Sequence, residues 1–321
     1  RGGGLKQVVV GGVGFVGANL VAELRKRHEV LVVARPSSIK KRPRIAEDIR
    51  RMGADILLLD SITPEALARV GGDAYHHVAG VLAGSREALE EAHVNLLRRV
   101  ISAASQVKAR VVYVSSTGVS TEIRGVPPGS KVSEEERHLD PATFVHRTPY
   151  EITKAEGERL LVSSDEALGG RWAILRPSVI FGPWGYEPQW RATLWAARRG
   201  LTLFTGSRNA VYAGDVAMVA EMASSGSLDR SWVYVNWPFE VDIGDIGMEI
   251  CRQMGRRCRR LSLRRAARLA YLAPSSSLTL LYRTLKYNYF YVSRRLEGFS
   301  YTSLQEAVSR FLEWASGGTS A

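Results

Sequence analysis

The sequence has only two cysteines in 321 residues, Cys251 and Cys258. Two are too few for a disulfide framework or for the four ligands of a structural zinc site. We therefore expect two half-buried thiols, no bound metal and a reducing, cytoplasmic setting. No apolar stretch is long enough to span a bilayer. The opening glycines run directly into a strand-like segment, so we also expect no signal peptide.

Acidic residues are in the minority, with 32 Asp and Glu against 44 Lys and Arg and a net charge of +12. A basic surface attracts nucleic acids, anionic lipids or phosphorylated substrates. The positive charge is densest between Arg256 and Arg268. No zinc-finger or RNA-recognition motif accompanies it, so we expect no nucleic-acid partner. The basic run is interpreted as a solvated helix, a peripheral membrane contact or a site for substrate phosphates.

Internal repeats and low-complexity tracts are absent, and the first 120 residues alternate between two periodicities. Short apolar, β-branched runs indicate buried strands at Gln7–Val10, Val30–Val33, Ile56–Leu59, Ala74–Val78 and Arg110–Val114. Helical patterns lie between them at Ala18–Arg27, Arg44–Met52, Pro64–Val70 and Ala92–Ser105. This alternation predicts an α/β fold, a Rossmann-type doubly wound parallel sheet that binds its ligand at the carboxyl edge.

The rest of the chain is less regular and predicts a smaller C-terminal α/β substrate domain. Gly118–Thr148 is expected to be a long loop, followed by a helix over Pro149–Ser163 and a strand over Trp172–Leu175. Further elements are expected at Gly214–Ser224, Trp232–Val235, Ile243–Met254 and Leu304–Ala315. We therefore expect a nucleotide-binding domain over residues 1–172 and a mainly substrate-binding domain over 173–321, with segments near 208–236 returning to the first.

Three glycines mark the turn after the first expected strand. Gly11 permits a tight turn, Gly14 lets the backbone approach a pyrophosphate, and Gly17 lets the following helix pack on the sheet. Phe15 and Val16 open that helix, whose free N–H groups favour an anion. The spacing predicts a dinucleotide site; a purely structural turn is the alternative.

The second strand indicates which dinucleotide is bound. Enzymes that use NAD usually place an acidic residue at its end, whereas this strand ends in Ala34 followed by Arg35. Basic and hydroxyl side chains follow, among them Ser38 and Lys40, which suit a 2′-phosphate. We therefore predict NADP, with NAD and a solvated basic loop as alternatives. Asp60 and Ser61 close the third strand and are expected to contact the adenine or to cap the loop.

A Tyr and a Lys four residues apart, Tyr150 and Lys154, share one face of an expected helix. The ammonium group is expected to lower the pKa of the phenol, which can then exchange a proton with an alcohol or a carbonyl. Upstream, the fifth strand ends in Ser115, Ser116 and Thr117, whose hydroxyls can bind a substrate oxygen. Glycine turn, hydroxyl cluster and Tyr–Lys pair occur in this order along the chain.

Together these motifs resemble the extended short-chain dehydrogenase/reductases, the NAD-dependent epimerase/dehydratase superfamily, over nearly the whole chain. The resemblance implies that Thr117, Tyr150 and Lys154 are catalytic and that the family commonly forms homodimers. It also implies cofactor contacts by Val78, Ala79, Gly80, Asn95, Ser115, Pro177 and Val179. The C-terminal part, including the motif around Gly298, loosely resembles the 3β-hydroxysteroid dehydrogenase-like and dihydroflavonol reductase-like branch.

The predicted function is an NADP-dependent oxidoreductase that moves a hydride between nicotinamide and a secondary alcohol or ketone of a small molecule. One alternative is a nucleoside-diphosphate-sugar epimerase or dehydratase that recycles its cofactor. A second is a non-catalytic nucleotide-binding sensor or assembly protein. Five aromatic residues either line the substrate pocket or pack the smaller domain, namely Phe181, Trp184, Tyr186, Trp190 and Trp195.

Overall fold

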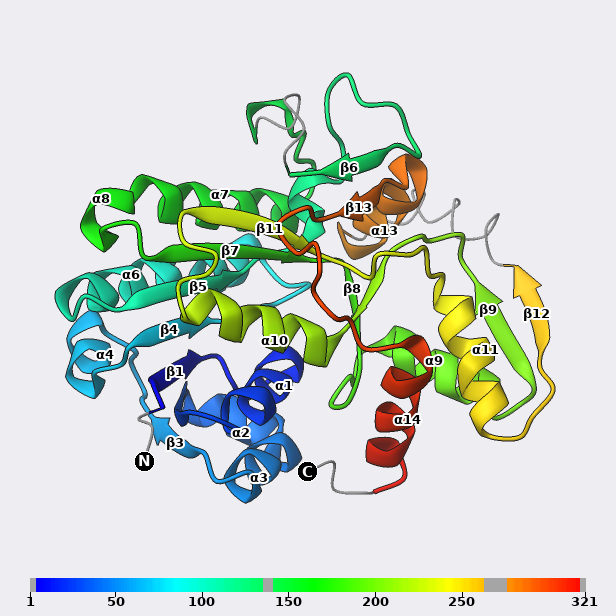
Figure 1. Cartoon of the computed structure of the whole chain (residues 1–321), viewed down its shortest axis with the longest axis horizontal. Helices are drawn as coiled ribbons and strands as arrows, with labels where there is room; N and C mark the ends of the chain where they lie inside the picture. Colours follow the sequence, from blue (N-terminus) through cyan, green and yellow to red (C-terminus); the bar gives the residue numbers. More distant parts are fainter. Residues whose placement is uncertain (1–3, 135–140, 263–275, 318–321) are drawn as a thin grey trace.

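A seven-stranded sheet lies at the centre of the structure, a computed structural model that describes residues 4–134, 141–262 and 276–317 (Figure 1). The strand order is β11-β7-β5-β4-β1-β2-β3, and every pairing is parallel. The strands are β1 (Lys6–Val10), β2 (Glu29–Ala34), β3 (Asp55–Leu58), β4 (Ala74–His77), β5 (Arg110–Val114), β7 (Trp172–Pro177) and β11 (Ser231–Val235). The predicted Rossmann-type fold is confirmed.

Each face of the sheet is covered by its own helices. One core joins Val9 and Val32 to α1 (Phe15–Leu24), α3 (Pro43–Arg51) and α10 (Ala213–Ser224). The other joins Val8 and Val33 to α4 (Pro64–Val70), α6 (Leu96–Gln106), α7 (Pro149–Ser163) and α8 (Asp165–Leu168). Neighbouring residues of a strand thus point to opposite faces, and each buried valine contributes about 1.5–3 kcal/mol.

The order of the strands reverses at β1, which lies between β2 and β4. The register pairs Val10 with Val33 on one side and with His77 on the other. The turns that leave these three strands therefore begin side by side at the carboxyl edge. In open parallel sheets this switch point is where ligands bind.

Outside the central sheet, the chain forms short strands that the sequence did not predict. They form three parallel pairs: β8 (Val179–Phe181) with β10 (Ala210–Tyr212), β9 (Leu201–Phe204) with β12 (Arg259–Ser262), and β6 (Lys131–Ser133) with β13 (Phe290–Val292). The helices α9 (Pro188–Ala197), α11 (Ile243–Gln253) and α14 (Leu304–Ala315) lie together on the right in Figure 1. Helix α13 (Ser276–Tyr287) lies near β6 and β13, and the short helix α5 (Arg86–Glu90) follows β4.

Two segments differ from the expected loops. Residues 118–148 contain the strand β6 and two short 3-10 helices, η2 (Thr117–Ser120) and η3 (Pro141–Thr143). The basic segment after β2 forms a helix, α2 (Pro36–Lys41), directly before α3. Proline occupies the first turn of both α2 and α3, where its fixed φ favours helix initiation.

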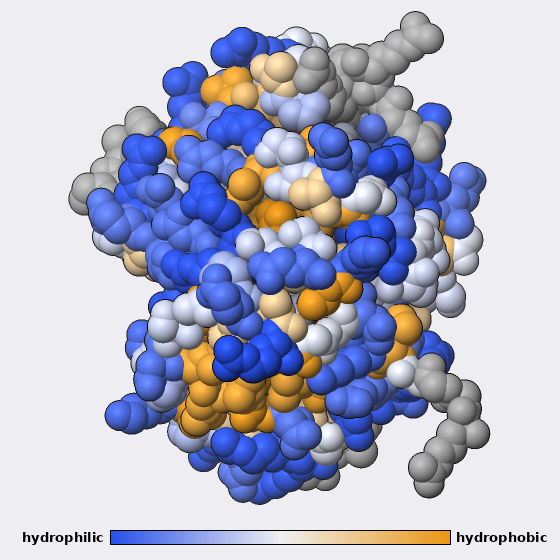
Figure 2. Space-filling view, turned by 90° about the vertical axis from the view of Figure 1, so that its left-hand side faces the viewer, coloured by the Kyte–Doolittle hydropathy of each residue, from blue (hydrophilic) through white to orange (hydrophobic). Residues whose placement is uncertain are grey.

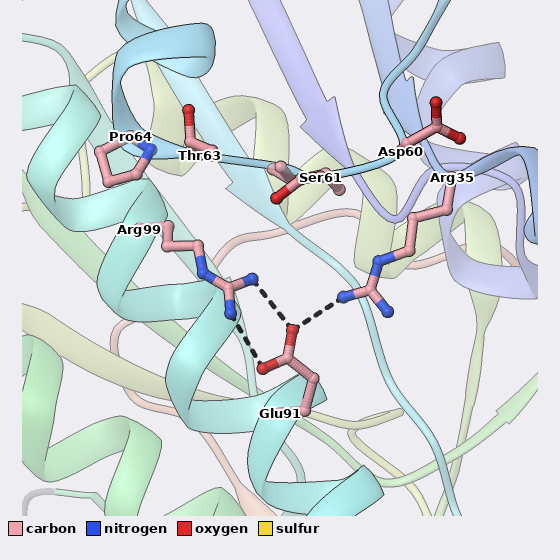
Figure 3. A pocket seen from close by; sticks show the side chains of 8 residues that line it. Arg35, Asp60, Ser61, Thr63, Pro64, Glu91 and Arg99 are labelled. Carbon is pink, nitrogen blue, oxygen red and sulfur yellow. Dashed lines mark hydrogen bonds and ion pairs between the residues drawn. The ribbon is translucent and has the colours of Figure 1, made fainter.

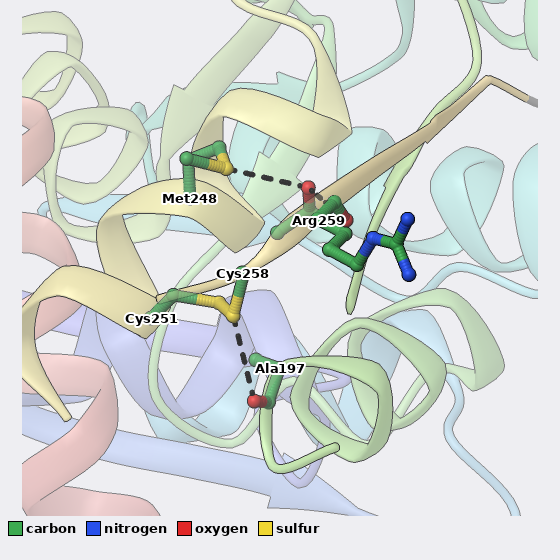
Figure 4. Close-up of a disulfide and its surroundings, with 6 residues drawn as sticks. Ala197, Met248, Cys251, Cys258 and Arg259 are labelled. Carbon is green, nitrogen blue, oxygen red and sulfur yellow. Dashed lines mark hydrogen bonds between the residues drawn. A yellow bond between two sulfur atoms is a disulfide. The ribbon is translucent and has the colours of Figure 1, made fainter. Parts of the chain in front are cut away.

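Cys251 and Cys258 form a disulfide, so the prediction of two free thiols is wrong (Figure 4). Cys251 lies on α11, which ends at Gln253, and Gly255 then turns the chain with a φ of 65°. Cys258 thereby returns to within 6.2 Å of Cys251 between Cα atoms, a spacing that suits a disulfide. The expectation of a reducing compartment was based on free thiols and loses this support.

No helix within the described ranges is long and apolar enough to cross a membrane. The left-hand side of the molecule in Figure 1 includes α4, α6 and α8. Figure 2 shows this side, which is mostly hydrophilic with several hydrophobic patches. Of the predicted basic run, Arg256 and Arg257 lie exposed before β12, and Arg259 and Arg260 lie exposed on it. Residues 264–268 are outside the described ranges.

Candidate active site and cofactor cradle

The turn between β1 and α1 has the shape that a pyrophosphate requires. Gly11 has a φ of 88°, and a Cβ there would lie 2.5 Å from the Ala79 Cα. Gly14 caps α1 with extended backbone, and a Cβ there would face only the Gly11 carbonyl oxygen, at 3.6 Å. No side chain caps α1, and its first turn has no acidic residue. The helix therefore presents N–H groups to open space that fits an anion.

Two glycine variants should separate folding from nucleotide binding. Gly14→Ala is expected to unfold like the wild type but to bind NADPH at least about tenfold more weakly, because its methyl group enters the phosphate space. Gly11→Ala should lose about 3 kcal/mol of stability as well, because of its positive φ and its clash with Ala79. Calorimetric titration and chemical unfolding measure the two effects. Equal NADPH affinity in Gly14→Ala would show that this turn does not hold the cofactor.

A cavity of about 300 Å³ lies where β2 and β3 end. Three residues predicted to contact the cofactor line it, namely Arg35, Asp60 and Ser61 (Figure 3). Two residues that the sequence did not single out complete its charged lining, Glu91 and Arg99. Its size is at the lower end for small-molecule sites, and its place beside the glycine turn suits the adenosine end of a dinucleotide.

The other predicted adenosine contacts lie outside this cavity. Ser38 and the exposed Lys40 are on α2, and the cavity lining does not include them. Asn95 ends a single π-helical turn, η1 (Glu91–Asn95), and its Oδ1 accepts a hydrogen bond from Arg98 Nη1 at 2.9 Å. A cofactor contact by these three residues stays a prediction.

The remaining predicted cofactor residues follow the ends of central strands. Val78, Ala79 and Gly80 leave β4, and the Val78 N–H donates to Val10 O on β1 at 3.1 Å. Ser115 follows β5, and its buried hydroxyl has no hydrogen-bond partner among the described residues. Pro177 ends β7, and Val179 begins β8. The Ser115 hydroxyl is a free polar group that a bound nucleotide or substrate could satisfy.

Tyr150 lies in the first turn of α7, at the carboxyl edge of the sheet. Thr148 and Glu151 form a capping box that fixes the start of this helix. The phenol is 8% exposed, and its ring packs against His93 with centroids 5.6 Å apart. Burial raises the pKa of Tyr150, while a hydrogen bond with the Ser116 side chain lowers it. The phenol is therefore protonated at neutral pH.

Lys154 lies one turn further along α7 and is 3% exposed. Its Nζ donates to Val114 O on β5 at 2.9 Å and lies 5.0 Å from the centre of the Tyr113 ring. Burial lowers the pKa of Lys154 to about 7, although the charge of Glu158 raises it. The expectation that Lys154 lowers the pKa of Tyr150 is wrong for this arrangement, because the ammonium is directed at β5.

The buried ammonium should destabilise the fold in a pH-dependent way. An ordinary lysine has a pKa of 10.5, and in the folded chain this value falls to about 7. The unfolded chain therefore binds the proton more readily between these values, and stability rises with pH across this window. We expect Lys154→Met to be about 1–3 kcal/mol more stable than the wild type at pH 7.

The difference between Lys154→Met and the wild type should shrink as the pH is raised from 7 towards 10.5. Comparing the two proteins by denaturant unfolding at each pH cancels the other titrating groups. A difference that stays constant, or that grows with pH, would show that the Lys154 pKa is not depressed.

The hydroxyl cluster after β5 divides into two parts. The Ser116 side chain interacts with Tyr150, and its Oγ also accepts the Gly118 N–H at 3.0 Å. Thr117, predicted as the catalytic hydroxyl, begins η2 and is partly exposed. The structure thus brings Ser116 to the phenol, and the role of Thr117 stays a prediction.

His93 is a buried residue of this site that the sequence analysis missed. Its Nε2 accepts the Val81 N–H at 3.3 Å, so the proton lies on Nδ1, which is 2.9 Å from Thr153 Oγ1. Burial lowers the pKa of His93 to about 2, so the ring is neutral. His93 thereby ties the segment after β4 to the helix that carries Tyr150. Its spacing from the buried Leu89 and Leu97 is the signal that could have revealed it.

A buried ion pair lies one turn beyond Lys154 on the same helix. Arg176 Nε donates to Glu158 Oε1 at 3.0 Å, and Nη2 donates to Oε2 at 2.6 Å. The guanidinium also stacks on Trp232, 3.7 Å from the ring centre. Glu158 thus fixes the α7 helix against β7 and places a negative charge near Lys154.

The aromatic residues proposed to line a substrate pocket mainly pack the second half of the chain. Phe181 and Trp190 are fully buried and contact each other with centroids 5.0 Å apart. Trp184 is buried and donates to Asp48 on α3 at 2.8 Å. Tyr186 and Trp195 are exposed. The interpretation that they pack the smaller domain therefore holds for Phe181 and Trp190, whereas Trp184 packs in the core of the central sheet.

The described residues contain no group of three or more His, Cys, Asp or Glu side chains that could hold a metal ion. The residues that surround Tyr150 and the glycine turn instead suit an organic cofactor with phosphates and hydroxyls. The arrangement can hold a dinucleotide along the carboxyl edge and exchange a proton at the Tyr150 phenol.

Many solved structures share this fold. One is the crystal structure of gox2253, with a TM-score of 0.74, 20% identity and coverage of 97% of this chain and 98% of that one. Another is the UDP-N-acetylglucosamine 4-epimerase from Methanobrevibacter ruminantium M1 in complex with UDP-N-acetylmuramic acid, with a TM-score of 0.72, 16% identity and coverage of 98% and 99%. A third is the Bordetella bronchiseptica enzyme WbmG in complex with NAD and UDP, with a TM-score of 0.72, 16% identity and coverage of 99% and 96%.

No curated protein sequence matches this chain significantly. The family model described as the NAD dependent epimerase/dehydratase family does match, over residues 7–236. That range includes the glycine turn, the hydroxyl cluster and the Tyr150–Lys154 pair. The chain therefore belongs to the NAD-dependent epimerase/dehydratase family and is an NAD(P)-binding enzyme of the extended short-chain dehydrogenase/reductase type.

Proposed function

We propose that this enzyme is an NADP-dependent oxidoreductase acting on a secondary alcohol or ketone of a small molecule. The observation that carries the proposal is the position of Tyr150 and Lys154. Both are buried on one face of α7, at the edge of the sheet where the glycine turn opens. A protonated phenol at this place can donate its proton to a carbonyl oxygen as the carbonyl is reduced.

The chain's own residues have separate tasks in this reaction. Tyr150 exchanges a proton with the substrate oxygen, and Ser116 stabilises the phenolate through its hydrogen bond. Lys154, whose ammonium donates to Val114 O on β5, is expected to bind the nicotinamide ribose. Thr117 and Ser115 offer hydroxyls that orient the substrate oxygen or the cofactor. The nicotinamide, when bound, supplies or accepts the hydride.

NADP is favoured over NAD by the end of β2. Ala34 offers no carboxylate to a ribose 2′-hydroxyl, and Arg35 extends into the cavity beside Asp60 (Figure 3). A guanidinium is well suited to a 2′-phosphate, because it donates paired hydrogen bonds. Residues 173–321 would mainly bind the substrate, and the active enzyme would be a homodimer.

The proposal is tested by adding NADPH and a panel of hydrophobic and sugar-derived ketones to the purified enzyme. We expect one NADPH to be consumed for each alcohol formed, and Gly14→Ala to be slower at the same NADPH concentration. Mass spectrometry of the denatured protein would identify any nucleotide that copurifies. Copurified NAD with no binding of NADPH would overturn the NADP assignment.

A second candidate is a sugar-nucleotide epimerase or dehydratase. The family carries this name, and two of the similar structures hold UDP or a UDP-sugar. An epimerase holds its cofactor tightly and shows no net NADPH consumption, whereas its product differs from the substrate at one stereocentre. Conversion of a UDP-sugar without NADPH consumption would favour this candidate. Nucleotide binding without any turnover would favour a non-catalytic role, against which the retained Tyr150 and Lys154 argue.

A further inference from the structure

The adenosine cavity contains an acidic residue that already binds its arginine. We propose that Glu91 is a specificity-determining residue: its carboxylate occupies Arg35 and thereby limits the preference of the cavity for NADP over NAD. This inference rests on the proposed function, which places the adenosine end of the cofactor in this cavity. It goes beyond that function by naming the residue that competes with the 2′-phosphate.

The contacts form a short chain of charges across the cavity (Figure 3). Glu91 Oε1 accepts from Arg35 Nη2 at 2.8 Å and from Arg99 Nη1 at 2.9 Å. Glu91 Oε2 accepts from Arg99 Nη2 at 2.9 Å. The carboxylate is therefore held bidentately by Arg99 and reaches Arg35 with one oxygen.

Glu91 remains charged at neutral pH, because the hydrogen bond from Arg99 holds its pKa below the ordinary value. The two arginines carry two positive charges, and Glu91 and Asp60 carry two negative charges around the same cavity. A phosphate that approaches Arg35 therefore meets a carboxylate already bound to that guanidinium. It must displace Glu91 or share Arg35 with it, and like charges at this distance repel.

The side chains involved can respond to a ligand. Arg35 is 40% exposed and Glu91 34% exposed, so the bond between them is not fixed by burial. Glu91 is the first residue of the π-helical turn η1, whereas Arg35 caps α2 after β2. The two residues are 56 positions apart in sequence and meet across the cavity. The two hydrogen bonds from Arg99 would still hold Glu91 if Arg35 turned to a ligand.

The test uses fragments that contain only the adenosine end, 2′,5′-ADP and 5′-AMP, in calorimetric titrations of the full chain. Glu91→Gln keeps the shape of the side chain and removes its charge. We expect this variant to bind 2′,5′-ADP about tenfold more tightly than the wild type. The reason is that Arg35, no longer paired with a carboxylate, can donate one more charge-assisted hydrogen bond to the 2′-phosphate. Binding of 5′-AMP should not change, because 5′-AMP has no 2′-phosphate.

Two controls separate this effect from a general change of charge. Glu47→Gln makes the same charge change on α3, where Glu47 pairs with Arg51 and is 60% exposed. It should leave both affinities as in the wild type. Arg35→Gln should weaken 2′,5′-ADP binding, and adding Glu91→Gln to it should give no gain, because the gain requires Arg35.

Four results would overturn the inference. An equal gain in Glu91→Gln and Glu47→Gln would mean that only the overall charge matters. Weaker 2′,5′-ADP binding in Glu91→Gln would mean that Glu91 positions Arg35 for the phosphate. Unchanged binding in Glu91→Gln, with tight 2′,5′-ADP binding by the wild type, would reject the role of Glu91 and leave the proposed function intact. A wild type that binds neither fragment, nor NADPH, would reject both.

Discussion

Replacing Tyr150 with Phe is expected to lower turnover by roughly a hundredfold to ten-thousandfold, the range that a positioned acid or base contributes. The substitution removes only the hydroxyl, so the ring should keep its contact with His93. Binding of NADPH should be retained, because the glycine turn and the Arg35 cavity are untouched. The loss should therefore appear in kcat rather than in the affinity for the cofactor.

The physical reason is that the surrounding residues fix the position of the Tyr150 hydroxyl and keep it protonated. Burial keeps the phenol protonated, and the Ser116 side chain is already hydrogen-bonded to it. The capping box holds Tyr150 at the start of α7, and His93 supports the ring through its bond with Thr153. A group positioned in this way loses little entropy when it transfers its proton.

The matched control is Tyr75→Phe. Tyr75 is also buried, but it lies on β4 with its hydroxyl donating to Leu67 O at 2.8 Å. Tyr75→Phe should lose about 1 kcal/mol of stability, as expected for one hydrogen bond, and should keep its turnover. Steady-state kinetics and unfolding of both variants provide the comparison. If Tyr150→Phe turned over as fast as the wild type, Tyr150 would not be the acid.

The parts of the fold that depend on local sequence were predictable. The turn after β1 requires glycine at two positions. A side chain on Gly11 would clash with Ala79, and a side chain on Gly14 would enter the space that the phosphates need. The central strands are continuous apolar runs because they are buried on both faces. Tyr150 and Lys154 share a helix face through simple periodicity. Each of these features depends on residues that are close together in the chain.

The features that depend on tertiary contacts could not be predicted in the same way. The depressed pKa of Lys154 follows from burial against β5, and Arg35 meets Glu91 across a distance of 56 residues in sequence. The disulfide could not be predicted from two cysteines alone, because it depends on Gly255, which turns the chain between them. Strands of three or four residues, such as β8, carry too little periodicity to be recognised.

Glu158→Gln is the substitution for which we expect the largest loss of stability, about 3–5 kcal/mol. The side chains of Glu158 and Arg176 are 9% and 1% exposed, and the two hydrogen bonds between them join α7 to β7. The Gln side chain keeps the shape but leaves the guanidinium without its counter-charge. One nitrogen of Arg176, Nη1, already lacks a hydrogen-bond partner within the described part of the chain. Denaturant unfolding measures the loss.

Glu249→Gln provides the matched control for this prediction. Arg252 holds Glu249 through the same pair of nitrogens, Nε at 2.7 Å and Nη2 at 2.6 Å, but the Arg252 side chain is 58% exposed. Because water screens exposed pairs, this variant should lose less than about 1 kcal/mol. Equal losses in Glu158→Gln and Glu249→Gln would show that burial does not determine the contribution of the Glu158 pair.

The double variant Glu158→Met with Arg176→Met separates the charge from the packing. Replacing a buried ion pair with apolar side chains of similar size is often neutral or stabilising, so the double variant should be more stable than Glu158→Gln. It should nevertheless be impaired in catalysis, because the charge of Glu158 raises the pKa of Lys154. Without that charge Lys154 is neutral over a wider pH range, and the decline of activity with rising pH should begin at a lower pH. An unshifted pH profile would mean that Glu158 acts only on the fold and not on the site.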